Sequence, residues 1–113
     1  MTKQSKQKNS LDLSIIIVSF NTKQVLYNCL QSIESLKSNL NFEIIISDNG
    51  STDGSVEMIQ KKYPKYKLIN NKANLGFSKG NNIAKKLVTS DTVLFLNSDT
   101  LVHKNSFDLP FDY

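Results

Sequence analysis

Two aspartates, each following a short apolar run, are the residues of this chain best placed to do chemistry. Asp48 follows three isoleucines at 44–46, and Asp99 follows the apolar run 93–96 after two polar residues. An ionised carboxylate can only accept hydrogen bonds, so Asp48 suits the N–H of a base such as uracil or thymine, or a ribose hydroxyl. The oxygen atoms of residues 97–100 suit Mg²⁺ or Mn²⁺, which would bridge two phosphates. Together the two aspartates predict a nucleotide and its metal ion.

Other residues beside these apolar runs could contact the same ligand. Phe20 ends the first run, where its ring could stack on a base, and Gly50 lets the backbone approach a ligand or take a positive φ angle. The carboxyl ends of the strands form one edge of an open α/β sheet, and we expect these residues to gather there. The candidate nucleotide-binding residues are Phe20, Asn21, Asp48, Gly50, Ser51 and Asn97, with Asp99 as the candidate metal ligand.

Each candidate also has an ordinary structural interpretation, which the sequence leaves open. Asp48 could cap the turn into the next helix, Phe20 could pack in the core, and Asn-Ser-Asp is common where a strand ends in a turn. The sequence contains no Gly-x-Gly-x-x-Gly and no Walker-type phosphate loop, and Gly76-x-x-x-Gly80 lacks the strand and turn that those motifs need. His103 is the only histidine, so no zinc site is predicted.

The apolar pattern predicts the elements that would position these residues. Residues 13–20 are continuous and β-branched, which is typical of a strand buried on both faces. A helix should follow, and Asp53 or Ser51 could cap a second helix that Tyr63-Pro64 stops. The expected strands are 13–20, 42–47, 66–70 and 92–96, with helices between them, the last at 78–88. This alternation predicts an α/β fold: a parallel, doubly wound, Rossmann-like sheet with helices on both faces.

Composition restricts the classes of partner. The 113 residues suit one domain, with a disordered lead-in at 1–10 and a folded domain at 11–113. All 14 basic residues are lysines and the formal net charge is +4. Without arginine the chain cannot recognise phosphate or guanine bidentately, so we expect no nucleic-acid partner. The positive charge could attract anionic ligands or a membrane surface, although a solvated lysine-rich surface is the simpler interpretation.

The single cysteine and the hydropathy pattern bear on the compartment. Cys29 cannot form an internal disulfide, which fits a reducing compartment. Its apolar neighbours at helical spacing predict that it is a small side chain packed in the core and not a nucleophile. The longest apolar run, 13–18, is too short to span a bilayer. We therefore expect a cytoplasmic chain whose membrane contact is at most peripheral. The predicted core-facing helical residues are Val25, Leu26, Cys29, Leu30, Ile33 and Leu36 in the first helix and Ile83, Ala84 and Leu87 in the third.

Four blocks of residues, in order, carry a family resemblance that covers residues 14 to about 102. They are Ser14–Thr22, Glu43–Ser55, Asn74–Asn82 and Leu94–Thr100. The chain resembles the family 2 glycosyltransferases, which are inverting enzymes with the nucleotide-diphospho-sugar transferase (GT-A) fold. The Asn-Leu-Gly-Phe and Leu-Asn-x-Asp forms look most like the rhamnosyltransferase-like branch.

The resemblance implies roles for individual residues. Phe20 would stack on the base and Asp48 would bind it. The last position of the family's Asp-x-Asp element, which holds the divalent ion against the diphosphate, corresponds to Asp99. Its first position is Asn97, whose neutral side chain would contact ribose or metal more weakly. The implied donor is a UDP- or dTDP-type sugar nucleotide, and the implied acceptor is an unidentified glycan or lipid.

In the family, the acceptor half and the catalytic base follow the metal element. The base, usually a carboxylate, deprotonates the acceptor hydroxyl. Asp108 and Asp112 are the only later carboxylates, and neither lies in a recognisable context. The expectation is a donor-binding half without the acceptor half, with the base beyond the chain end. Two alternatives are a non-catalytic nucleotide-binding module left by truncation and a receiver-like domain with Asp48 as phospho-acceptor, although Ser19-Phe20-Asn21 lacks the acidic pair that a receiver needs.

Overall fold

Strands and helices alternate along the chain in the predicted order. The structure, a computed structural model, describes residues 11–35 and 41–99. Its elements are β1 (Leu13–Ser19), α2 (Lys23–Glu34), β2 (Phe42–Asp48), α3 (Ser55–Lys62), β3 (Lys67–Asn70), α4 (Phe77–Lys85) and β4 (Val93–Asn97). The predicted lead-in at 1–10 lies outside the described residues, as do Leu36, His103, Asp108 and Asp112.

All four strands are parallel and lie in the order β3-β2-β1-β4. The strand β1 is therefore central, with β2 on one side and β4 on the other. Its last residues pair with the ends of both neighbours, because Ser19 is opposite Asp48 and Val18 is opposite Asn97. The register thus brings the ends of β2 and β4 to the same edge of the sheet, which we call the carboxyl edge.

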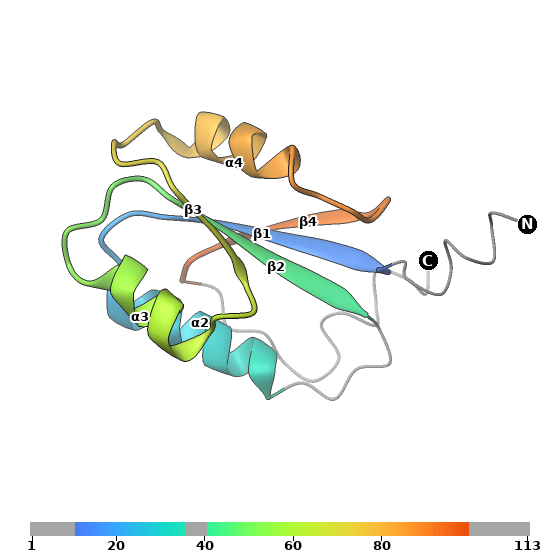
Figure 1. Ribbon diagram of the computed structural model, residues 1–113, viewed down its shortest axis with the longest axis horizontal. Coiled ribbons are helices and arrows are strands. Elements are labelled where there is room, and N and C mark those ends of the chain that lie inside the picture. The colour runs from blue at the N-terminus through green and yellow to red at the C-terminus, as the bar shows by residue number, and fades with distance from the viewer. Residues whose placement is uncertain (1–10, 36–40, 100–113) are drawn as a thin grey trace, which may run out of the picture.

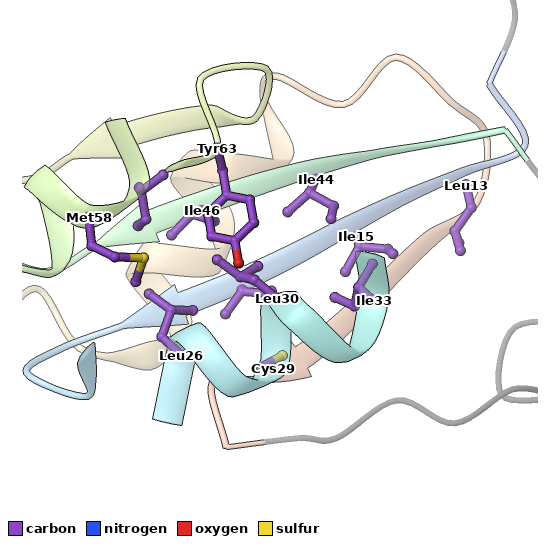
Figure 2. Close-up of a cluster of buried hydrophobic side chains, with 12 residues drawn as sticks. Leu13, Ile15, Leu26, Cys29, Leu30, Ile33, Ile44, Ile46, Met58 and Tyr63 are labelled. Carbon is purple, nitrogen blue, oxygen red and sulfur yellow. The ribbon is translucent and has the colours of Figure 1, made fainter. Parts of the chain in front are cut away.

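The helices form one layer on each side of the sheet, as predicted (Figure 1). Helices α2 and α3 cover one face, and α4 covers the other. Side chains of β1 alternate between the two layers: Ile15 and Ile17 join the cluster under α2 and α3, whereas Ile16 joins the cluster under α4. Figure 2 shows the larger cluster, in which Leu26 and Leu30 of α2 point toward the strands. Both faces of β1 are covered, which is consistent with its apolar residues at five of seven positions.

The predicted apolar stripes are confirmed in their centres and wrong at two positions. Leu26, Cys29, Leu30 and Ile33 are buried, but Val25 is 38% exposed because it lies beside the stripe that faces the sheet. In the third helix Ala84 is buried, whereas Leu87 is 40% exposed because α4 ends at Lys85.

Burial, reinforced by the charge of Asp99, raises the pKa of Cys29 to about 11. This thiol is therefore a packing group, as predicted.

A polar cluster fixes the opposite, amino edge of the sheet under the α4–β4 connection. The carboxylate of Glu43 accepts hydrogen bonds from the Ser14 hydroxyl and from the Thr89 amide and hydroxyl, and Lys67 forms an ion pair with it at 2.8 Å. Burial alone would raise the pKa of Glu43, but these partners outweigh it and lower the pKa to about 2.

Among the described residues, no helix has the length and apolarity needed to cross a membrane.

Candidate functional site

Four connections meet at the carboxyl edge, on the left of Figure 1. They are residues 20–22 after β1, 49–54 after β2, 71–76 after β3 and the turn that begins at Ser98 after β4. These connections contain every residue that the sequence singled out for nucleotide or metal binding, apart from Asp48 and Asn97, which end β2 and β4.

Asp48 is fully buried at the end of β2 and holds the turn that follows. One carboxylate oxygen accepts the backbone N–H of Ser51 at 2.8 Å, and the other accepts the Ser51 hydroxyl at 2.7 Å. The turn-capping interpretation is therefore correct for this carboxylate. Each oxygen keeps a further lone pair, and contact between Asp48 and a base stays a prediction.

Asn21 joins the connection after β1 to the connection after β2. Its backbone has φ of 50°, in the left-handed region that asparagine tolerates better than most residues. Its N–H donates to the Ser51 hydroxyl at 2.8 Å, and its side-chain oxygen accepts the Thr52 N–H at 2.7 Å. The neighbouring Phe20 lies outside β1 and is 42% exposed, so the core interpretation of its ring is wrong.

Asp53 caps two helices at once. One oxygen accepts the Ser55 N–H at 3.0 Å and the Ser55 hydroxyl at 2.5 Å, at the start of α3. The other accepts the backbone N–H of Lys23, the first residue of α2, at 2.9 Å. Although burial acts in the opposite direction, these hydrogen bonds hold the pKa of Asp53 below its usual range. The N-cap residue of α3 is Gly54, which makes no side-chain cap bond. From the position before it, Asp53 accepts the first N–H of α3, as predicted, and the first N–H of α2 as well.

Asparagine amides connect the β3–α4 connection to the rest of the edge. The Asn49 amide donates to the Gly76 carbonyl at 3.1 Å, and the Asn71 amide donates to the Asn49 side-chain oxygen at 2.8 Å. Gly50 has φ of 82°, and a Cβ atom there would lie 2.9 Å from the backbone nitrogen of Ala73. The predicted positive φ at Gly50 is confirmed, and the group that approaches it closely is this neighbouring loop.

The turn after β4 carries the candidate metal ligand on its exposed side. Asn97 and Asp99 are exposed, and the hydroxyl of Thr22 donates to that of Ser98 between them at 3.1 Å. No three histidine, cysteine, aspartate or glutamate side chains come together as a metal site within 11–35 and 41–99. The available donors are oxygen atoms around one carboxylate, which fits a Mg²⁺ or Mn²⁺ ion that takes its remaining ligands from water and phosphate.

The register places the two aspartates on opposite sides of the same central strand. Asp48 ends β2, and Asp99 follows β4 by two residues. The strands on either side of β1 are roughly 10 Å apart, because neighbouring strands are about 4.8 Å apart. The predicted meeting of these two strand ends at one edge is confirmed.

The amide contacts of Asn49 and Asn71 were not predicted, because their partners are distant in the sequence.

Comparisons with known proteins agree with this architecture. The family model for glycosyl transferase family 2 matches residues 14–108. The chain is 36% identical over 94 residues to the uncharacterized glycosyltransferase YfnE of Bacillus subtilis, covering 81% of this chain and 24% of YfnE. It is 35% identical over 99 residues to abequosyltransferase RfbV of Salmonella typhimurium, covering 83% of this chain and 30% of RfbV.

A solved structure has the same fold. The fragment of S. aureus TarS that contains residues 1–349 matches with a TM-score of 0.78 and 25% identity, over 90% of this chain and 32% of that fragment. The same fragment has also been crystallised in complex with UDP. The chain thus spans less than a third of the length of YfnE and of RfbV. Its parallel sheet, with helices on both faces, is part of a GT-A fold, and the chain belongs to glycosyl transferase family 2.

Proposed function

We propose that this chain binds the nucleotide-diphospho-sugar donor of an inverting glycosyltransferase at the carboxyl edge. The observation that carries the proposal is the placement of Phe20, Asp48 and Asp99 at one edge, at the ends of three adjacent strands, in a chain of this family. The UDP complex of TarS supports a uridine or thymidine nucleotide as the ligand.

In this proposal, different residues of the carboxyl edge contact different parts of the donor. The exposed ring of Phe20 stacks on the base. Asp48 accepts the imide N–H of the base at the carboxylate oxygen that now accepts the Ser51 hydroxyl, once the hydrogen of that hydroxyl turns away. The remaining contacts to the base and ribose come from Asn21, Gly50, Ser51 and Asn97.

Asp99 would hold a Mg²⁺ or Mn²⁺ ion against the diphosphate, with Asn97 as a neutral neighbour. When bound, the ion supplies positive charge to the departing nucleotide, which this arginine-free chain cannot provide with guanidinium groups. The reaction we propose is attack by an acceptor hydroxyl, on a glycan or lipid, at the anomeric carbon with inversion. A carboxylate outside the described residues would take the proton.

A thermal-shift series tests the binding step. We expect UDP or dTDP at tenfold excess over Kd, with Mn²⁺, to stabilise the chain by about 1.4 kcal/mol. Asp48→Asn should abolish this gain while keeping the turn, because the asparagine oxygen still accepts the Ser51 N–H. Asp91→Asn changes the charge equally at an exposed site and should keep the gain. Absence of any shift at millimolar nucleotide would contradict the proposal.

The alternative, a non-catalytic nucleotide-binding module, makes the same binding prediction. A turnover assay with mixed sugar nucleotides separates the two, since the module would bind nucleotide without sugar transfer or donor hydrolysis. The observation that supports this second function is that the chain spans less than a third of the length of YfnE and RfbV.

We further propose a cytoplasmic location with peripheral membrane contact. The end of α3 carries the exposed residues Lys61 and Lys62, and the exposed Lys65 follows in the α3–β3 connection, away from the carboxyl edge. Lys62 lies over the Tyr27 ring at 5.7 Å. Each lysine near an anionic leaflet contributes about 1 kcal/mol of attraction. Reversing these three charges should release the chain from phosphatidylglycerol vesicles, whereas reversing Lys79, Lys85 and Lys86 on the α4 side should have less effect.

A further inference from the structure

Thr22 stands at the N-cap position of α2 but does not cap the helix with its side chain. A threonine at this position usually accepts a hydrogen bond from an N–H in the first turn. Here no side-chain cap bond forms. The Thr22 hydroxyl instead donates to the Ser98 hydroxyl at 3.1 Å and lies 3.3 Å from that of Ser19.

The helix start is satisfied by a different residue. The N–H of Lys23 donates to Asp53 at 2.9 Å, from the connection after β2. Because Asp53 supplies this cap, the Thr22 hydroxyl is available for a contact across the sheet edge. The half-buried Thr22 and Ser98 then join the connection after β1 to the turn after β4.

These contacts, together with the backbone between neighbouring residues, connect the two candidate ligand sites. Asp48 bonds Ser51, and Ser51 accepts the N–H of Asn21. Thr22 follows Asn21 directly and bonds Ser98, which precedes Asp99. The position of the turn that carries Asp99 is therefore linked to the position of the nucleotide-binding loop.

We propose that Thr22 is a positioning residue that couples nucleotide binding to divalent-cation binding, an inference that rests on the proposed function. Asp99 lies in an exposed turn beyond the last residue of β4. The Thr22–Ser98 bond fixes this turn before the ligand arrives, so the ion and the diphosphate find Asp99 already in place. Loss of the bond leaves the turn to be ordered on binding, which costs conformational entropy.

Titration of UDP with and without Mn²⁺ tests the coupling. The quantity measured is the ratio of the Kd without Mn²⁺ to the Kd with Mn²⁺. Thr22→Val removes the hydroxyl at nearly constant volume, and we expect the ratio to fall at least threefold while the metal-free Kd stays within twofold. Thr22→Ser should restore the ratio. Thr52→Val is the matched control, because Thr52 contributes its backbone N–H, not its hydroxyl, to this edge. An unchanged ratio, or an equal loss of affinity with and without Mn²⁺, would overturn the proposal.

A measurement on the free protein separates this proposal from the proposed function. We expect the NMR order parameters of the Ser98 and Asp99 amides to fall in Thr22→Val and to be retained in Thr22→Ser, with those of α4 unchanged. If the wild-type chain binds no UDP, the proposed function fails, and unaltered order parameters would refute the positioning role as well. Ser98→Ala removes the other partner of the same bond and replaces Thr22→Val if that variant does not fold.

Discussion

The Glu43 cluster predicts a specific dependence of stability on pH. In the folded chain this carboxylate has a pKa of about 2, against a reference value of 4.5. A carboxylate whose pKa is lower in the folded state than in the unfolded state stabilises the fold, and this stabilisation is fully present above the pKa of the unfolded state. This contribution is lost as the pH falls from about 4.5 toward 2.

The size of the effect follows from the pKa difference and from exposure. One pKa unit corresponds to about 1.36 kcal/mol, so the unscreened shift is worth roughly 3 kcal/mol. The side chain of Glu43 is only 10% exposed, but that of its partner Lys67 is 41% exposed, and solvent screens the pair. We therefore expect about 1 to 2 kcal/mol at pH 7.

Urea unfolding of the wild type and of Glu43→Gln at pH 7, 4 and 2.5 measures this contribution. Glutamine keeps the shape but cannot accept all the hydrogen bonds from Ser14, Thr89 and Lys67. The variant should be less stable at pH 7, and the difference in unfolding free energy should shrink steadily toward pH 2.5. Glu57→Gln, at an exposed position of α3, should show no such convergence. A pH-independent difference for Glu43→Gln would refute the assignment of the low pKa to this cluster.

Two further variants probe the carboxyl edge. Asp53→Ala removes the acceptor of the first N–H of α2 and of α3, and should lower the unfolding free energy by about 2 kcal/mol, at about 1 kcal/mol per hydrogen bond. Asp91→Ala, at an exposed position, should leave the unfolding free energy nearly unchanged in the same urea titration. Gly50→Ala introduces a Cβ atom 2.9 Å from the backbone nitrogen of Ala73, so it should cost more than Gly54→Ala. Gly54 has a similar φ, but a Cβ atom there meets only the flexible Lys23 side chain, at 3.2 Å. Equal urea midpoints for the two glycine variants would show that the loop moves aside freely.

The strands and the helix cores could be predicted because their signals are local. The isoleucines of 15–17 and 44–46 indicate strands covered on both faces, and the spacing of Leu26, Cys29, Leu30 and Ile33 indicates one helical stripe. The errors lie at the ends of such patterns. Val25 and Leu87 are apolar at plausible spacing, but their exposure depends on how far the covering layer extends, which no local pattern contains.

The interior of the candidate site was harder to predict because its contacts are not local. Asn21 bonds Thr52, and Asn49 bonds Gly76, across 31 and 27 residues respectively. From the sequence, the 13 asparagines are indistinguishable from a compositional bias. The structure shows why such residues serve here: a short amide both donates and accepts, so it can satisfy the backbone groups of a neighbouring loop.

The polar connections at the carboxyl edge support ligand binding under either of the two proposed functions. A ligand-binding edge cannot be stabilised by covering it with apolar side chains, because the ligand needs that surface. Here Asp48, Asn21 and Asp53 hold the loops through hydrogen bonds to backbone N–H groups instead. Such preorganisation favours binding whether or not sugar transfer follows. Binding measurements and loop variants will therefore establish the nucleotide site, and only product formation from a sugar nucleotide distinguishes a transferase from a binding module.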